Sequence, residues 1–153
     1  IFDGTTLCID EEQDIVYREA PRPDAPVPVP PQAPDTSVLS RVIDPDPVLL
    51  FRYSALTFNG HRIHYDQPFC TGSEGYLGLI VHGPLLATLL LDLLRREKPD
   101  ASVRSFDFRA ISTLFDTEDF SVHGEPGDDG KTFRLWARRH DGALAMQAKA
   151  TIE

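Results

Sequence analysis

Two histidines and a carboxylate lie close together in the middle of the chain, at His61, His64 and Asp66. An imidazole has an unperturbed pKa of about 6.5, so it can take and give a proton at neutral pH. His61 and His64 are three positions apart and share one face if the segment is helical. The segment is therefore a candidate for general acid–base chemistry, in which Asp66 either adds a second titrating group or only ends a short helix.

A metal site is the alternative use of these side chains. Zinc is bound by three or four converging ligands, and the chain offers His61, His64, Asp66 and His82. Only the spacing of the histidine pair at positions 61 and 64 points to shared coordination. We therefore predict acid–base chemistry without a metal ion or another cofactor.

A second candidate feature is Gly83, within His82-Gly83-Pro84 at the start of a leucine-rich segment. The first N–H groups of a helix have no intrahelical partner, and the helix dipole favours negative charge there. Glycine lets a ligand oxygen approach such an amide closely. From the residues alone, a second interpretation stays open, in which Gly83 only permits the turn into Pro84.

A buried helix and a curved sheet are the elements that must position these residues. Leucines cover more than one face of segment 84–97, which predicts a helix buried in the core, and Pro84 suits the first helical position. We predict that residues 48–56 form the first strand of the main domain and that a short helix covers 61–66. Alternation of apolar and polar residues predicts four later strands, within 102–115, 120–125, 132–139 and 144–152. This order favours an α+β fold, one antiparallel sheet around a central helix.

Proline marks the domain boundary. Most of the 13 prolines lie between Ala20 and Pro34, and proline cannot pair within a central strand. We predict an N-terminal arm over 1–19, a linker over 20–37 and the main domain over 38–153. The chain begins at Ile1 rather than at a methionine, and we expect further sequence before it.

Composition excludes several classes of protein. A net charge of −9 disfavours a nucleic-acid binder, which needs a basic face. A membrane span needs about 20 mostly apolar residues, and the richest apolar run, 77–94, is interrupted by His82, Pro84 and Asp92. Cys8 and Cys70 are too few for a disulfide framework. We therefore expect a reducing compartment, the cytoplasm or, in a eukaryote, the mitochondrial matrix.

Two separated strings carry a family resemblance. SALTFNGHRIHYD, at 54–66, and IVHGPL, at 80–85, are similar to the hydratase segment and the central-helix start of the MaoC-like hotdog hydratases. The similarity is greatest to the branch of 3-hydroxyacyl-thioester dehydratases and mesaconyl-CoA hydratases. It covers roughly 48–153, where Phe108-Arg109-Ala110 and Leu135-Trp136-Ala137 resemble later strands of that family.

This resemblance implies a hotdog fold and a lyase of fatty acid metabolism that reversibly hydrates a 2-enoyl thioester of CoA or a carrier protein, with a mesaconyl-like acyl group favoured. A single hotdog domain usually buries an edge or face on a partner, so we expect a homodimer or a paired repeat. Residues 10–18 resemble the end of a preceding hotdog repeat, which could be that partner.

The resemblance also implies roles for individual residues. His64 matches the catalytic histidine of the family, and the amide of Gly83 matches its oxyanion donor. Asn59 stands where the family usually has an aspartate, and an amide cannot carry a proton as a carboxylate does. Either His64 is the single proton carrier while Asn59 orients the reactants, or Asp66 or His61 supplies the second group.

The thioester carrier and the rival functions involve other residues. Arg95, Arg96 and Arg109 are the arginines that we predict to contact the phosphates of CoA. A hotdog thioesterase is one rival, since it would use a carboxylate on the central helix, and Asp92 is the carboxylate in the middle of that helix. A non-catalytic acyl-thioester-binding half of a larger enzyme is the other rival, and Asn59 is its main support.

Overall fold

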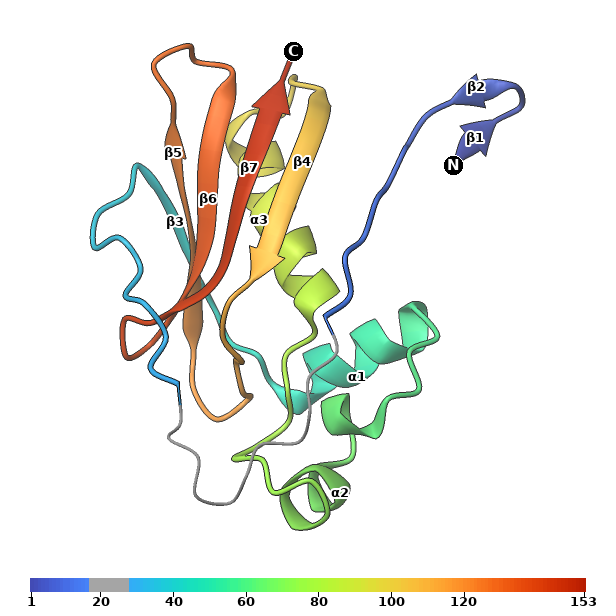
Figure 1. Ribbon diagram of the computed structural model, residues 1–153, viewed down its shortest axis with the longest axis vertical. Coiled ribbons are helices and arrows are strands. Elements are labelled where there is room, and N and C mark those ends of the chain that lie inside the picture. The colour runs from blue at the N-terminus through green and yellow to red at the C-terminus, as the bar shows by residue number, and fades with distance from the viewer. Residues whose placement is uncertain (17–27) are drawn as a thin grey trace.

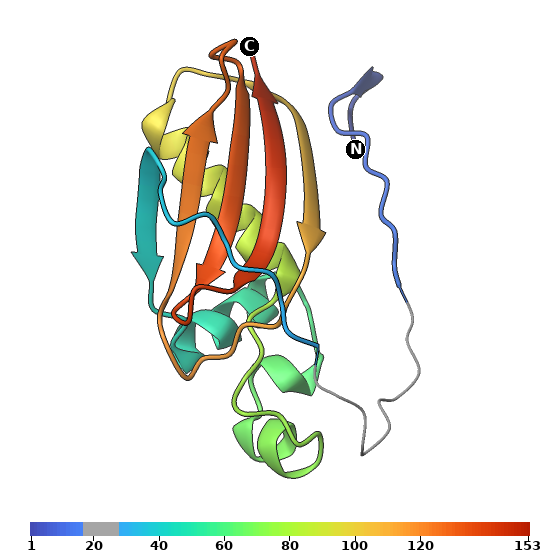
Figure 2. The ribbon, with the colours of Figure 1, turned by 60° about the vertical axis from the view of Figure 1, so that its left-hand side comes forward.

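A computed structural model describes residues 1–16 and 28–153 of the chain. A five-stranded antiparallel sheet, ordered β3-β5-β6-β7-β4, curves around the long helix α3 (Figures 1 and 2). The α+β hotdog architecture predicted from the sequence is confirmed. The bounds of these elements are β3 Leu39–Ile43, α3 Gly83–Glu97, β4 Val103–Ala110, β5 Phe120–Pro126, β6 Thr132–Arg139 and β7 Leu144–Ile152.

Helix α3 forms the centre of the hydrophobic core. Its buried leucines recur at helical spacing, at positions 85, 86, 90, 93 and 94, so they form one apolar stripe that must be covered. The inner faces of β5, β6 and β7 cover it with Val122, Phe133, Leu135 and Met146. Arg95 and Arg96 lie in its last turn, where cations favour the helix dipole.

The first predicted strand is wrong, because residues 48–56 belong to the helix α1, Pro47–Leu56. The Asp46 carboxylate accepts hydrogen bonds from the N–H groups of Val48 and Leu49 at 2.7 and 3.0 Å, and Pro47 occupies the first turn. This capped start favours a helix over the strand that the apolar run suggested. The first strand of the sheet is instead β3, which pairs with β5 and places Ile43 opposite Phe120.

Short helical elements connect α1 to α3. The 3-10 helix η1 covers Arg62–His64 and helix α2 covers Gln67–Gly72, so the predicted short helix at 61–66 is one 3-10 turn. The four later strands lie within or close to their predicted ranges. Between β6 and β7, Gly142 has a φ of 87°, which favours glycine in that turn.

The proline-rich segment packs on the sheet where the structure describes it. Residues 20–27 of the predicted linker lie outside the described residues, but Ala33 N–H donates to Gly142 O at 2.9 Å and Leu144 N–H donates to Pro31 O at 2.8 Å. Ala33 is buried against Trp136 on the outer face of the sheet. In the arm, β1 (Phe2–Asp3) and β2 (Thr6–Leu7) form a small exposed hairpin. The division at 19 and 37 stays a prediction.

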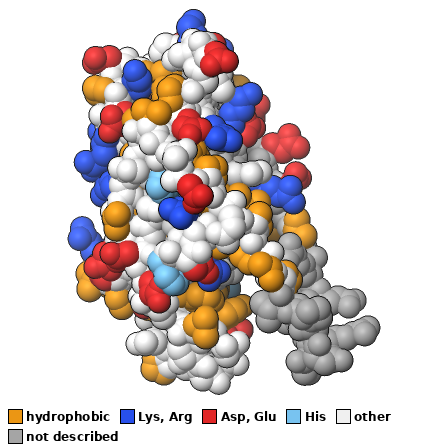
Figure 3. All heavy atoms as spheres, turned by 90° about the vertical axis from the view of Figure 1, so that its left-hand side faces the viewer, with side chains coloured by type: hydrophobic (Ala, Val, Ile, Leu, Met, Phe, Trp, Pro, Cys, Tyr) orange, Lys and Arg blue, Asp and Glu red, His pale blue; other side chains and the backbone are white. Residues whose placement is uncertain are grey.

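The surface carries charges of both signs. On the side that Figure 3 shows, acidic and basic side chains are interspersed rather than gathered by sign. Within residues 1–16 and 28–153, no helix combines the length and the apolar character that a membrane crossing requires.

Candidate active site

The His64 ring is held in one orientation at the end of η1. Its Nδ1 lies 2.7 Å from the carbonyl oxygen of Ile80. A carbonyl only accepts, so Nδ1 carries the proton of the neutral ring and Nε2 is left as the basic nitrogen. Nε2 has no hydrogen-bond partner among the described residues. Nε2 of His64 is therefore an oriented nitrogen that can act as a base, although only 8% of the residue is exposed.

The loop that receives this hydrogen bond leads directly into α3. Ile80 N–H donates to Ile63 O at 3.0 Å on one side, and Val81 N–H donates to Leu114 O at 2.9 Å on the other. The loop is therefore clamped between η1 and the segment after β4. It ends at His82, whose ring is stacked on that of His64 with centroids 3.8 Å apart and planes 17° apart. This stack places the His64 ring against the residue that precedes Gly83, the first residue of α3.

Gly83 faces open space. A Cβ built on Gly83 would meet no atom within 4 Å, and its N–H has no partner among the described hydrogen bonds. An unpaired amide at the positive end of a 15-residue helix suits a developing negative charge. The histidine and the glycine that sequence reasoning singled out are thus linked through the stack of His64 on His82.

The other local candidates have structural contacts of their own. The Asn59 side-chain oxygen accepts from the His61 N–H at 3.0 Å, as in an Asx turn. Asp66 accepts from the Phe69 N–H at 3.1 Å and pairs with Arg62 at 2.8 Å, and these hydrogen bonds, that of Arg62 foremost, hold the Asp66 pKa below its ordinary value. His61 is exposed, with its ring centroid 5.6 Å from that of His64. Only His61 is therefore free to act beside His64 without losing a described side-chain contact.

Burial controls the charge of the stacked histidines. It lowers the pKa of His64, and the Ile80 hydrogen bond partly opposes that effect. His82 is 1% exposed, and burial, followed by the neighbouring His64, lowers its pKa to about 4. Both rings are therefore neutral at neutral pH, which leaves His64 able to accept a proton.

The neutral state of His82 predicts a loss of stability in mild acid. Below pH 6.5 the unfolded state binds a proton that folded His82 does not accept until about pH 4. The contribution of neutral His82 to the free energy of unfolding is therefore complete above pH 6.5. It is lost as the pH falls from 6.5 to 4, and the loss reaches ~3 kcal/mol. The lowered pKa values of His64 and His123 act with the same sign.

Urea unfolding at pH steps between 4.5 and 7.5 measures this dependence. His82→Phe removes the titrating group, so the free energy of unfolding should depend less steeply on pH than in the wild type. This comparison distinguishes the effect of His82 from that of the carboxylates, which titrate in both proteins. Equal slopes in the two proteins would contradict the assignment of a neutral, buried His82.

The three predicted phosphate-binding arginines do not lie beside His64. Asp92 pairs with Arg95 and Arg96 at 2.7 Å each and with Arg41 of β3 at 2.9 Å. These contacts, with Arg96 foremost, lower the Asp92 pKa to about 2. Arg96 lies about 20 Å along the helix from Gly83, at 1.5 Å per residue. Asp92 is thus the centre of an ion-pair cluster that joins α3 to β3.

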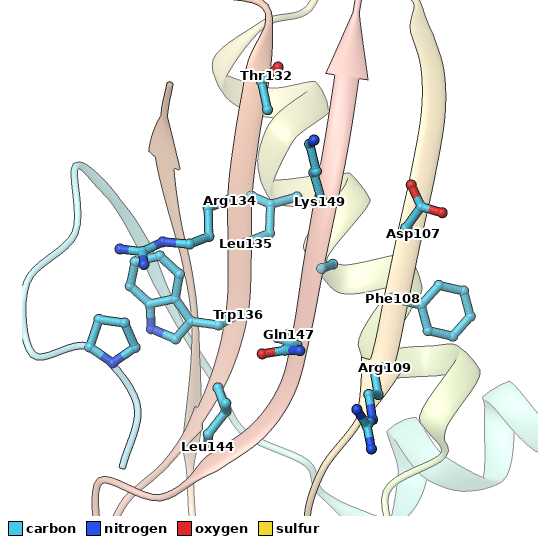
Figure 4. A pocket seen from close by; sticks show the side chains of 12 residues that line it. Asp107, Phe108, Arg109, Thr132, Arg134, Leu135, Trp136, Leu144, Gln147 and Lys149 are labelled. Atoms are coloured by element: carbon cyan, nitrogen blue, oxygen red, sulfur yellow. The ribbon is translucent and has the colours of Figure 1, made fainter. Parts of the chain in front are cut away.

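Arg109 lies on the opposite face of the sheet from α3. It pairs with Gln147, which in turn pairs with Trp136, and Trp136 belongs to the small outer cluster rather than to the main core. Arg109 lines a cavity of about 500 Å³ there (Figure 4). A ligand in that cavity would be separated from His64 by the sheet.

No group of three or more metal-ligating side chains converges within the described parts of the chain. His64 and His82 each use one nitrogen to bind Ile80 or Ser54. The stack of two rings face to face is a packing arrangement, since metal ligands direct their nitrogens at a common point.

Sequence reasoning missed two members of the site. His82 was considered as a possible metal ligand, and Ser54 had no assigned role, yet the Ser54 hydroxyl lies 2.8 Å from His82 Nε2. A serine within a mostly apolar segment was the available signal. It was hidden because 48–56 was predicted as a strand, which would turn alternate residues outward.

Comparison with solved structures defines the class of fold. The chain superposes on an (R)-hydratase from A. caviae involved in PHA biosynthesis with a TM-score of 0.66 and 19% identity, covering 83% of this chain and 96% of that one. R-hydratase PhaJ1 from Pseudomonas aeruginosa gives a TM-score of 0.67 and 14% identity, covering 82% and 81%. The fold is therefore that of the hotdog hydratases.

The sequence then defines the family. Residues 1–116 match the family described as hydroxyacyl-thioester dehydratase type 2, and the chain belongs to this family. It is 48% identical to the mesaconyl-C(4)-CoA hydratase of Chloroflexus aurantiacus, over 100% of this chain and 53% of that protein. It is 37% identical to the mitochondrial hydroxyacyl-thioester dehydratase type 2 of Schizosaccharomyces pombe, over 75% and 39%. The chain thus spans about half the length or less of these curated relatives.

Proposed function

We propose that this chain carries the catalytic centre of a hydro-lyase that reversibly adds water to a 2-enoyl thioester, with a CoA thioester of a small, mesaconyl-like acyl group as the favoured substrate. The observation that supports this most directly is the pairing of an oriented, neutral imidazole at His64 with an unpaired helix-start amide at Gly83. The names of the relatives from Chloroflexus and Schizosaccharomyces point to the same chemistry.

The two groups divide the reaction between them. In the hydration direction, Nε2 of His64 removes a proton from water while the water oxygen bonds to C3 of the enoyl group. The electron pair of the double bond moves toward the thioester oxygen, whose negative charge the Gly83 N–H stabilises. The imidazolium then returns the proton to C2, and the carbonyl re-forms, so the two proton transfers balance with one base.

Asn59 makes a single proton carrier the simpler mechanism. Its side chain cannot accept and release a proton, and its oxygen is already bonded to the His61 N–H. Asp66 remains ionised in its contacts with Arg62 and Phe69. We therefore assign both proton transfers to His64, with His61 as the neighbour that modulates it.

Turnover of an enoyl thioester tests this function. Incubation of the chain with crotonyl-CoA and with mesaconyl-CoA should remove the enone absorbance without releasing free thiol. Release of free thiol would instead indicate a thioesterase, which the ion-paired state of Asp92 disfavours. Binding of the thioester with neither product would indicate the non-catalytic binding half that Asn59 left open.

Gly83→Ala tests whether the thioester approaches the helix start. The free protein has room for the methyl group, but a residue with a Cβ is disfavoured in a helical conformation before proline, so the substitution is made in a Pro84→Ala background. We expect kcat/KM to fall about 5- to 160-fold relative to Pro84→Ala alone, since overpacking costs about 1–3 kcal/mol. The melting temperatures of the two proteins should agree. An unchanged kcat/KM would place the thioester elsewhere.

We also propose that the chain works paired with another hotdog unit, either a second copy or a preceding repeat. Strand β4 is an edge of the sheet, and an unpaired edge strand invites association. Val103 and Phe108 of β4 are about half exposed, as is Phe51 of α1. Light scattering of the chain alone, compared with Phe108→Glu, tests this pairing, and a monomeric wild type would favour a preceding repeat as the partner.

The two cysteines support a proposal for the compartment in which the protein works. Cys8 and Cys70 are both free among the described residues, which fits a reducing compartment. We propose the cytoplasm, or the mitochondrial matrix in a eukaryote.

A further inference from the structure

One buried histidine of the site takes no part in the proton transfers described above. His82 has its ring in parallel contact with that of His64 at 3.8 Å. The edge of Tyr53 closes off another side, with ring centroids 4.8 Å apart and planes 63° apart. A stack of two imidazoles inside the core has to be held in place by polar contacts on each ring, because buried polar nitrogens are costly when unpaired.

Ser54 supplies the polar contact for His82. Its hydroxyl lies 2.8 Å from Nε2 in a buried position, while Nδ1 of His82 has no partner among the described residues. If the hydroxyl donates to Nε2, one group is left unpaired, the Nδ1 N–H. If Nε2 donates instead, both the hydroxyl hydrogen and the Nδ1 lone pair are left unpaired. The first arrangement is therefore favoured.

His64 has the same arrangement in the other half of the stack. One nitrogen is bonded to Ile80 O, one ring face is covered by His82, and the remaining nitrogen is the base. Ile80 is only two residues before His82, so the same short loop supplies both the hydrogen bond and the stacking surface. A displacement of His82 would therefore disturb both restraints on His64.

We propose that His82 is the positioning residue of His64: its neutral ring, anchored to α1 through Ser54, keeps the His64 ring in the orientation that bonds Ile80 and leaves Nε2 free. This proposal concerns the acid–base residue of the proposed hydro-lyase and rests on that function for its catalytic consequence. It gives α1 a role in catalysis, since Ser54 and Tyr53 of that helix contact the stack.

Among residues 1–16 and 28–153, few other groups that titrate or carry charge face the stack. Tyr53 lies against His82 from α1, and His61 approaches His64 from the start of η1. Arg62 of η1 is paired with Asp66. The control His61→Gln therefore shows whether a change in the protonation of His64 after substitution of His82 is due to His61 instead.

Nitrogen-15 NMR of histidine-labelled protein gives a readout that does not depend on turnover. In the wild type, His64 should show a protonated Nδ1 and a bare Nε2 at pH 7.5. In His82→Ala, we expect a mixture of the two tautomers, a titration midpoint raised toward the ordinary value because burial is lost, and a kcat at least tenfold lower with KM within about twofold. Ser54→Ala, which removes only the anchor, should change the same signals in the same direction by a smaller amount.

His123→Ala is the matched control, since His123 is also buried, stacked on an aromatic ring and bonded to serines, but on the outer face of the sheet. It should leave the His64 signals and kcat unchanged. If His82→Ala is unfolded, Ser54→Ala decides. A His64 tautomer that stays as in the wild type in both variants overturns the proposal, whether or not kcat falls. If the wild type hydrates no enoyl thioester, the proposed function fails, while the NMR comparison still decides whether His82 orients His64.

Discussion

Replacing His64 with alanine is expected to lower kcat for enoyl-thioester hydration by about 10²–10⁴-fold, the range typical of a lost general acid–base residue. The effect should be large because two of the nearby candidates, Asp66 and Asn59, cannot replace it. Asp66 is held ionised by Arg62, and Asn59 carries no titrating proton. The decrease is measured as the initial rate of enone loss at saturating substrate.

The structure offers matched controls for this substitution. His64→Gln keeps a polar side chain of similar length and should be nearly as inactive as alanine, since an amide cannot transfer a proton. His61→Ala removes an exposed imidazole of the same segment and should cost less than about tenfold. If His64→Ala turns over at the wild-type rate while remaining folded, the mechanism assigned to this site is wrong.

The acid limb of kcat/KM provides a further check on the same residue. The reaction requires unprotonated His64, and burial lowers its pKa from 6.5. The value of kcat/KM for hydration should therefore increase as the pH rises through a midpoint below 6.5, and it should reach its plateau at neutral pH.

Phe133→Ala is expected to have the largest effect on stability. Phe133 of β6 is 1% exposed and lies in the core around α3. Truncating a buried phenylalanine to alanine typically costs about 3–5 kcal/mol, since it removes apolar contact and leaves a cavity. A domain of this size has a total stability of roughly 5–15 kcal/mol, so the variant should unfold at a much lower urea concentration.

Phe58→Ala is the matched control for that loss. The same change of side chain at a position that is 96% exposed should alter the free energy of unfolding by less than about 0.5 kcal/mol. Its φ of 55° is unfavourable for phenylalanine and alanine alike, so the backbone contribution should cancel. Equal losses at the two positions would contradict the location of the core.

The long elements could be predicted because their patterns are strong. Leucines on more than one face of 84–97 leave little alternative to a buried helix, and the alternation in 132–139 and 144–152 fits only half-buried strands. Residues 48–56 were misassigned for a physical reason. An apolar run of that length suits a strand or a helix, and the decision came from the Asp46 carboxylate, which binds two N–H groups of the first turn.

Within the site, the types of residue could be predicted but their contacts could not. His64 and Gly83 were identified by their chemistry and their resemblance to a family. The use of Asp66 as a helix cap and ion-pair partner depends on η1 and α2 meeting at that residue. The stack of His64 on His82 joins residues 18 positions apart, and no periodicity in the sequence marks that contact.

The sequence by itself determined which groups this protein has for its chemistry: an imidazole that titrates near neutral pH, a glycine at a helix start and a helix apolar enough to be buried. These are properties of the residues and of their local order. The tertiary structure alone decided which nitrogen of His64 is the base and which ring holds it. Those outcomes depend on hydrogen bonds and burial between distant segments, which arise only when the sheet closes around α3.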